Sequence, residues 1–234
     1  MKLYLIPCPI AENTAENTLP QEVRQSILLC KHFLVENVRT ARRFISELKL
    51  GIKIEDLEFH ELTKESKLPE VKKILSQLKA NQCKHLGILS EAGCPGVADP
   101  GALAVQLAHQ MNIEVEPLVG PSSILLALMG SGFSGQSFVF HGYLPIEKGQ
   151  RVRKIEQLEK EVFKSGQTQI FMETPFRNNG LFEDIIENCH PETLLSIAME
   201  VKSEDGFCKT LSVQEWKKQI PQLHKRPSIF LLGR

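Results

Sequence analysis

The chain has 234 residues, with 28 basic and 28 acidic side chains and therefore a formal net charge of +0. Hydrophobic residues make up 42% and charged residues 24%, a composition that is typical of globular proteins and excludes long intrinsic disorder. The length allows one large or two modest domains with a sizeable core. The balanced charge excludes a globally basic nucleic-acid binder, although a local basic face could still bind RNA.

The six cysteines include no Cys-x-x-Cys, and the seven histidines are scattered without metal-ligand spacing. We therefore expect free thiols in a reducing compartment, mostly surface histidines, and no metal site. The apolar start of the chain ends at Pro7 and is too short for a signal peptide. No stretch approaches the ~20 apolar residues of a membrane span, so we expect a cytoplasmic protein without a membrane partner.

In the first half of the chain, apolar runs of strand length alternate with segments of helical periodicity. This pattern is typical of βαβ units and a mainly parallel sheet, so the predicted fold class is α/β. Strands are predicted at residues 2–6, 33–36, 57–60, 86–89 and 114–119. Helices are predicted at residues 18–30, 39–48, 69–80, 102–111 and 124–129.

A Gly/Ser-rich stretch at residues 130–136, followed by a polar and basic segment, marks a change in composition. We place a boundary there, between an N-terminal α/β lobe at 1–141 and a C-terminal α/β lobe at 142–234. In the second lobe we predict helices at 151–164 and 178–188, a short helix holding Trp216, and strands at 168–172, 194–199, 207–211 and 229–232. This lobe alternates less regularly, so we expect antiparallel strands and a mixed sheet.

The segment SEAGCPGVADPG, residues 90–101, stands between a buried strand and a helix. Ligands bind at that place in α/β proteins, outside the carboxyl ends of parallel strands. Its glycines permit positive φ and a close approach of ligand to backbone, and Asp99 supplies a carboxylate. The alternative is a tight strand-to-helix connection in which Asp99 caps the helix.

Two other strand ends carry comparable turns. LVGPSS at 118–123 could line the same cleft, or its serines could simply cap a helix. FMETPFR at 171–177 places Glu173 and Arg177 at a strand end, either as site residues or as an ordinary ion pair. Glycine-rich phosphate loops, His-Glu-x-x-His and a nucleophile elbow are absent, which disfavours nucleotide phosphates, zinc chemistry and a serine hydrolase.

Five segments occur in one order and at one spacing: LYLIPCPI, SEAGCPGVADPG, EPLVGPSSILLAL, FHGYLP and FMETPFR. Together they resemble the tetrapyrrole methylase superfamily of S-adenosylmethionine-dependent methyltransferases. The best-fitting branch methylates a cytidine ribose 2′-hydroxyl in small-subunit ribosomal RNA. The resemblance spans nearly the whole chain, and its most specific part is the second segment, with Ser-Glu-Ala-Gly-x-Pro and Asp-Pro-Gly.

The resemblance implies a two-lobed protein, usually a homodimer, that binds S-adenosylmethionine in the cleft between its lobes. A slot lined by small residues and backbone polar groups suits a donor with a sulfonium, an adenine and a charged tail. Carried over onto this chain, the donor-binding residues are Pro9, Ile10, Glu91, Ala92, Gly93, Val97, Asp99, Pro121, Ser122, Ser123, Met172, Glu173 and Ala198.

The sequence departs from this branch on the acceptor side. Ala11 replaces a glycine, Asn37 replaces an acid, and Phe176 stands where the branch has histidine. A ribose hydroxyl is a poor nucleophile that needs a general base, and the candidates are Glu36 and Glu173.

Basic side chains near the cleft could bind RNA phosphates. The candidate substrate-binding residues are Arg39, Arg42, Arg43 and Arg177. A second basic cluster consists of Lys148, Arg151, Arg153 and Lys154. Both groups could equally be solvated surface charges.

The expected partners are ribosomal RNA or the small ribosomal subunit. Two alternatives stay open on sequence alone. The acceptor could be a tetrapyrrole or another small molecule, or the chain could bind S-adenosylmethionine without catalysis.

Overall fold

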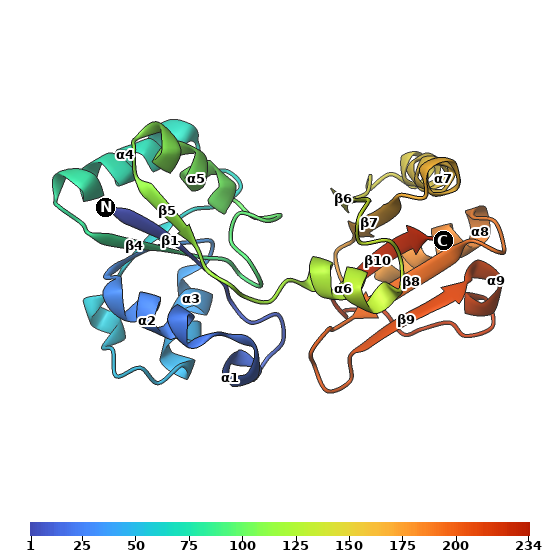
Figure 1. Cartoon of the computed structure of the whole chain (residues 1–234), viewed down its shortest axis with the longest axis horizontal. Coiled ribbons are helices and arrows are strands. Elements are labelled where there is room, and N and C mark those ends of the chain that lie inside the picture. The colour runs from blue at the N-terminus through green and yellow to red at the C-terminus, as the bar shows by residue number, and fades with distance from the viewer. The chain divides into compact units, whose positions relative to one another are not determined.

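The computed structural model describes all 234 residues, which form two compact units, Met1–Ser122 and Ser123–Arg234 (Figure 1). Each unit is built on one five-stranded sheet with helices packed on it. The first sheet is parallel and the second is mixed, which confirms the predicted α/β class. None of the helices has the length and apolar character that crossing a membrane requires.

The first sheet has the strand order β3-β2-β4-β1-β5, and all its strand pairs are parallel. Its strands are β1 (Lys2–Ile6), β2 (His32–Val35), β3 (Glu58–Glu61), β4 (His85–Leu89) and β5 (Glu114–Pro117). The helices of this unit are α1 (Ala15–Thr18), α2 (Gln21–Leu29), α3 (Val38–Glu47), α4 (Leu68–Ala80) and α5 (Gly101–Gln110), with a 3-10 turn η1 (Ile54–Asp56).

The helix predicted over residues 18–30 is divided in the structure. Leu19 is extended, with φ −103° and ψ 125°, and Pro20 lies just before the first residue of α2. A residue that precedes proline is pushed out of the helical region, so the chain breaks at Leu19 and starts a new helix at Gln21.

Helices cover both faces of the first sheet (Figure 1). Apolar residues of α2 and α3, such as Ile27 and Phe44, pack on one face, whereas α4 and α5 contribute Leu75 and Leu107 to the other. β2 therefore leads into a helix on one face, and the neighbouring β4 leads into a helix on the opposite face. The sheet has a topological switch point between β2 and β4, where open parallel sheets bind ligands.

The second sheet has the order β6-β7-β10-β8-β9; β6 and β7 are parallel, and the other pairs are antiparallel. Its strands are β6 (Phe138–Tyr143), β7 (Thr168–Met172), β8 (Leu194–Met199), β9 (Phe207–Ser212) and β10 (Ser228–Gly233). The helices are α6 (Ser123–Ser131), α7 (Lys148–Ser165), α8 (Asn178–Asn188) and α9 (Val213–Trp216). α7, α8 and α9 pack on one face around the buried Trp216, and α6 packs on the other.

The two compact units divide earlier in the chain than the lobe boundary expected at 141/142. Ala127 and Leu128 of α6 are buried in a cluster with Ile170 and Ala198 of the second sheet. β6 also pairs with β7. The apolar face of α6 therefore assigns it to the second unit, which the flexible composition of residues 130–136 does not indicate.

Candidate functional site

The loops that follow β1, β4 and β5 meet at the carboxyl edge of the first sheet. Cys8 and Gly93 exchange two backbone hydrogen bonds, with N···O distances of 2.9 and 3.0 Å. Gly93 has φ +74°, and a Cβ atom there would lie 3.3 Å from the Pro121 carbonyl oxygen and 3.5 Å from the Ile10 side chain. Glycine thus allows three strand-end loops to pack together, and these loops carry the predicted donor-binding residues of the first unit.

Three residues that the sequence analysis did not assign to the site hold this junction. The Ser90 hydroxyl is buried and donates to the Gly93 carbonyl at 2.9 Å, while Cys8 supplies the backbone pairing described above. The Cys94 thiol lies 3.4 Å from the Pro121 carbonyl. Ser90 opens the 90–101 motif, so its position in that motif was the available signal, whereas nothing local marks Cys8.

Asp99 shapes the loop that contains it. One carboxylate oxygen, Oδ1, accepts hydrogen bonds from the backbone N–H groups of Gly96 at 2.6 Å and Gly101 at 2.7 Å. Burial raises the pKa of Asp99, and these two hydrogen bonds oppose the rise. The capping alternative therefore describes Asp99 well. Near Asp99, Val97 and Ala98 are exposed, and Ala98 has φ 61°, which is uncommon for a residue other than glycine.

Carboxylates gather at the switch point between β2 and β4. Glu36 follows β2 and Glu91 follows β4, and the Thr40 hydroxyl of α3 donates to Glu91 Oε1 at 2.5 Å. Burial raises the pKa of Glu36; the charge of Lys64 lowers it, and the charges of Glu91 and Asp99 raise it further. The charges of Glu91 and Asp99 thus reach Glu36, and carboxylates at this edge would favour a cationic ligand.

Asn37, which replaces an acid of the resembling branch, caps α3. Its side-chain oxygen accepts from the backbone N–H groups of Arg39 at 2.9 Å and Thr40 at 3.3 Å. Asparagine serves as well as aspartate in this capping position, so the replacement preserves the local backbone. It also leaves Glu36 as the carboxylate that directly follows β2.

The three arginines of α3 have different surroundings. Arg42 lies over the Phe59 ring, 5.3 Å from its centroid, and Arg43 pairs with Glu47 at 3.5 Å. Arg39 is exposed in the first turn of the helix, next to the loop that holds Glu36. Among the three, Arg39 is the best placed for a ligand at the carboxyl edge.

In the second unit, two predicted donor-binding residues lie in one row of the sheet. Met172 of β7 and Ala198 of β8 both pair with Ile229 of β10, from opposite sides. All three belong to the apolar cluster on the face covered by α6. Ile229 was not predicted, because only the strand order places it between the other two.

Glu173 and Arg177 form the ion pair that the sequence left as an alternative. Glu173 is 4% exposed; its Oε1 atom accepts from Arg177 Nη2 at 2.6 Å and from the Thr174 backbone N–H at 2.6 Å. The Glu173 carboxylate raises the pKa of Arg177. Glu173 Oε2 and Arg177 Nε are also buried and have no hydrogen-bond partner in the chain. The structure thus ties both candidate residues to each other.

The second basic cluster is likewise engaged within its own unit. Arg151 Nε donates to Asp184 Oδ2 at 2.6 Å, Arg151 Nη2 forms an ion pair with the same oxygen at 2.6 Å, and Lys148 lies 3.4 Å from this carboxylate. Asp184 is 1% exposed. Two of the four cluster members therefore anchor the start of α7 to α8.

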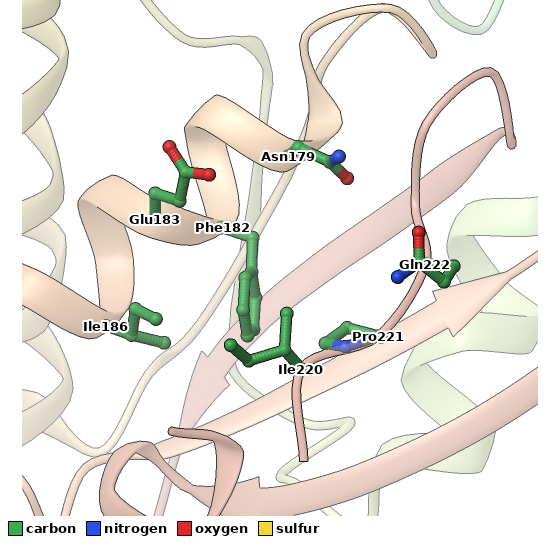
Figure 2. Close-up of a pocket in the computed structure, with 7 residues that line it drawn as sticks. All are labelled: Asn179, Phe182, Glu183, Ile186, Ile220, Pro221 and Gln222. Atoms are coloured by element: carbon green, nitrogen blue, oxygen red, sulfur yellow. The ribbon is translucent and has the colours of Figure 1, made fainter. Parts of the chain in front are cut away.

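A pocket in the second unit lies between α8 and residues 220–222 (Figure 2). Phe182, Ile186 and Ile220 gather at one end, and the amides of Asn179 and Gln222 lie at the other. None of its lining residues is a predicted site residue, and Glu183 is its one titratable group. The residues on strand-end loops, rather than this pocket, form the candidate site.

Curated proteins named ribosomal RNA small subunit methyltransferase I are similar to the chain. The relative from Hydrogenobaculum sp. is 29% identical over 231 residues, covering 98% of this chain and 92% of the relative. That from Buchnera aphidicola subsp. Schizaphis graminum is 26% identical over 98% of this chain and 77% of the relative. The relative from Mesorhizobium japonicum is 33% identical, but the match covers 75% of this chain and only 55% of the relative. No protein-family model matches the chain.

Solved structures share the fold. The methyltransferase CobJ aligns with a TM-score of 0.66 at 14% identity, covering 100% of this chain and 94% of CobJ. The uroporphyrin-III C-methyltransferase from Thermus thermophilus, complexed with S-adenosylhomocysteine, aligns with a TM-score of 0.58 at 15% identity. This alignment covers 100% of this chain and 98% of the uroporphyrin-III C-methyltransferase. The curated relatives support assignment of the chain as an S-adenosylmethionine-dependent methyltransferase, and the solved structures show that it shares the fold of CobJ and of the uroporphyrin-III C-methyltransferase.

Proposed function

We propose that this protein transfers a methyl group from S-adenosylmethionine to a ribose 2′-hydroxyl of small-subunit ribosomal RNA. The observation that carries the proposal is the junction at Gly93, where the loops after β1, β4 and β5 pack together at the carboxyl edge of a parallel sheet. The names of the curated relatives support the RNA acceptor. The exposed Arg39 in the first turn of α3 supports phosphate binding at the same edge.

The residues present fit the methyl donor. S-adenosylmethionine, when bound, supplies an electrophilic methyl group on a cationic sulfonium. In the first unit, the backbone of Pro9, Ile10 and residues 91–93 would hold it, and the carboxylates of Glu36 and Glu91 would favour its positive charge. We propose that Ser123, Met172, Glu173 and Ala198 of the second unit complete the donor site.

The acceptor hydroxyl must lose its proton as the methyl group is transferred. We assign this proton to Glu36. Because burial and neighbouring carboxylates raise the pKa of Glu36, its ionised form is a better base than an ordinary glutamate. Glu173 suits this role less well, because Arg177 already neutralises its carboxylate. Its proposed contribution is to position the donor rather than to accept the proton.

The test is transfer of a tritiated methyl group from S-adenosylmethionine to small ribosomal subunits that lack their own methylations. We expect label in the ribosomal RNA, at one nucleotide whose 3′ phosphodiester resists alkali because the 2′-oxygen is methylated. Fully methylated subunits serve as the control and should take up no label. Label at a base, or on protein, would overturn the proposed acceptor.

Calorimetry with S-adenosylmethionine separates failure of the acceptor from failure of the donor site. Donor binding without RNA labelling would favour a tetrapyrrole or another small-molecule acceptor, or a protein that binds the donor without catalysis. Absence of donor binding would overturn the whole proposal. We further propose a cytoplasmic homodimer, which light scattering on the purified protein and cell fractionation would test.

A further inference from the structure

Two histidines and a glutamate meet on the first sheet, away from the donor loops. His32 begins β2 and pairs with Glu58, which begins β3. Glu58 and His60 are two residues apart on one strand, so their side chains point to the same face of the sheet. One ligand atom from each of the three residues lies within 4.8 Å of the others, and His32 Nδ1 is 3.4 Å from Glu58 Oε2.

One ring nitrogen atom of each histidine lacks a hydrogen-bond partner. His60 Nε2 and His32 Nδ1 are both buried, yet neither makes a hydrogen bond within the chain. Even at 3.4 Å, His32 Nδ1 and Glu58 Oε2 lack hydrogen-bond geometry. The two imidazole rings stack, with centroids 5.8 Å apart and planes 24° from parallel. Since buried polar atoms are almost always paired in proteins, this arrangement indicates that these nitrogen atoms bind a ligand from outside the chain.

The surroundings of His60 favour its neutral form. Burial lowers the pKa of His60, and the neighbouring His32 lowers it further, while Glu58 opposes them. A neutral imidazole offers a nitrogen lone pair to a metal, whereas a protonated one repels it.

We propose that His32, Glu58 and His60 bind a divalent transition metal, with Zn²⁺ as the best match. Two imidazole nitrogens and one carboxylate oxygen, with water in a fourth position, form a common zinc ligand set. Zinc–ligand bonds of about 2.0–2.1 Å place tetrahedral ligands roughly 3.3 Å apart, close to the 3.4 Å between His32 Nδ1 and Glu58 Oε2. Mg²⁺ and Ca²⁺ prefer all-oxygen ligands and do not fit this set.

The location suggests a structural role. β3 is one of the two edge strands and pairs only with β2, so a metal held by both strands would fasten that edge. His32 and Glu58 begin their strands, whereas the donor loops follow the strands' carboxyl ends. We therefore expect metal binding to raise stability without a direct part in methyl transfer, and this inference does not depend on the proposed function.

The test is titration of the chelator-treated, metal-free protein with ZnCl₂ by calorimetry, together with thermal unfolding with and without the metal. We expect one equivalent of Zn²⁺ to bind and the melting temperature to rise. His60→Gln and Glu58→Gln should each weaken Zn²⁺ binding at least about tenfold and remove most of the rise. The matched control is His109→Gln, which changes an exposed histidine on α5 and should leave both measurements unchanged.

Three outcomes would overturn the proposal. The first is that Zn²⁺ does not bind the wild-type protein, and the second is that MgCl₂ produces the same stabilisation. The third is that His60→Gln and Glu58→Gln bind Zn²⁺ as tightly as the wild type and the control. The Glu58 side chain is 68% exposed, so its glutamine variant should fold even if His60→Gln does not. A Co²⁺ complex with the visible spectrum of four- or five-coordinate metal, lost in Glu58→Gln, would support the ligand set.

Discussion

The two units use carboxylates in opposite ways. At the carboxyl edge of the first sheet, the charges of Glu91 and Asp99 raise the pKa of Glu36, and burial raises the pKa of both Glu36 and Asp99. In the second unit, Asp184 and Glu173 are each held by an arginine at 2.6 Å.

The difference separates carboxylates that stabilise the fold from carboxylates suited to chemistry. A buried acid with a guanidinium partner fastens two segments, because removing either charge leaves the other unpaired. Acids that repel one another destabilise the fold slightly, and such sites are candidates for function. Exposure alone would mislead here, since the most buried acids of the chain, Asp184 and Glu173, are those in ion pairs.

The largest effect should come from exchanging glutamate for glutamine at each candidate base. Glu36→Gln should lower the rate of methyl transfer about 10²–10⁴-fold, because it removes the proton acceptor. Glu173→Gln should mainly lower the free energy of unfolding, by about 1–3 kcal/mol, because Arg177 loses its charged partner. Single-turnover experiments measure the rate of methyl transfer of both variants, and urea unfolding measures their stability.

Glu65→Gln is the control for that pair, since it removes an exposed acid whose charge reaches Glu36. We expect nearly wild-type turnover from it. If Glu36→Gln also retains full turnover, the base has been assigned to the wrong residue.

Removing the most buried acid should destabilise the second unit more than removing any exposed charged residue does. Asp184→Ala should lower the free energy of unfolding by about 3–5 kcal/mol, because Arg151 is left largely buried and unpaired. Glu187→Ala, which removes the more distant and exposed partner of Lys148, should change it by less than about 0.5 kcal/mol. Urea unfolding followed by fluorescence of Trp216, which lies in the second unit, gives the free energy of unfolding of both variants. Equal losses in the two variants would contradict the structural role assigned to the Asp184–Arg151 pair.

The junction of strand-end loops should tolerate no side chain at Gly93. Gly93→Val places a β-branched residue at φ +74° and pushes it toward Pro121 and Ile10, so donor affinity should fall at least about tenfold, or ~1.4 kcal/mol. Calorimetry with S-adenosylmethionine measures the change. Gly135→Ala is the control, because a Cβ there meets nothing within 4 Å. Unchanged affinity in Gly93→Val would show that the donor binds elsewhere.

The smallest effect concerns the pH dependence of stability. Because the pKa of Glu36 is raised in the folded state, the folded protein binds this proton more tightly than the unfolded chain does. The resulting stabilisation is present below the unfolded value, about 4.3, and is lost as the pH rises through the folded pKa. Glu36→Gln avoids that loss, so it should be more stable than wild type at neutral pH, by at most about 0.5 kcal/mol.

Urea unfolding of both proteins between acid and neutral pH tests this sign. The two stabilities should diverge as the pH rises. If the wild type instead became more stable relative to the variant as the pH rises, the proposed repulsion among the carboxylates would be wrong. A variant that is more stable but inactive would match the cost that functional sites impose on stability.

The sequence by itself determined the strands of the first sheet, the helices between them and the turns that carry the candidate site. These features are local: alternating apolar runs define βα units, and Gly-Pro turns at strand ends are visible in short segments such as residues 90–101. The same locality explains why the candidate edge could be proposed from the sequence, since all strands of a parallel sheet end on one side.

Only the tertiary structure decided which distant residues meet. The Thr40–Glu91 hydrogen bond, the row of Met172, Ile229 and Ala198, and the meeting of His32 with His60 all depend on strand order and register. It also decided which acids are paired with arginine. Hydrophobic periodicity determines which face of a strand is buried but not which strand lies beside it, because strand pairing depends on the packing of the whole core.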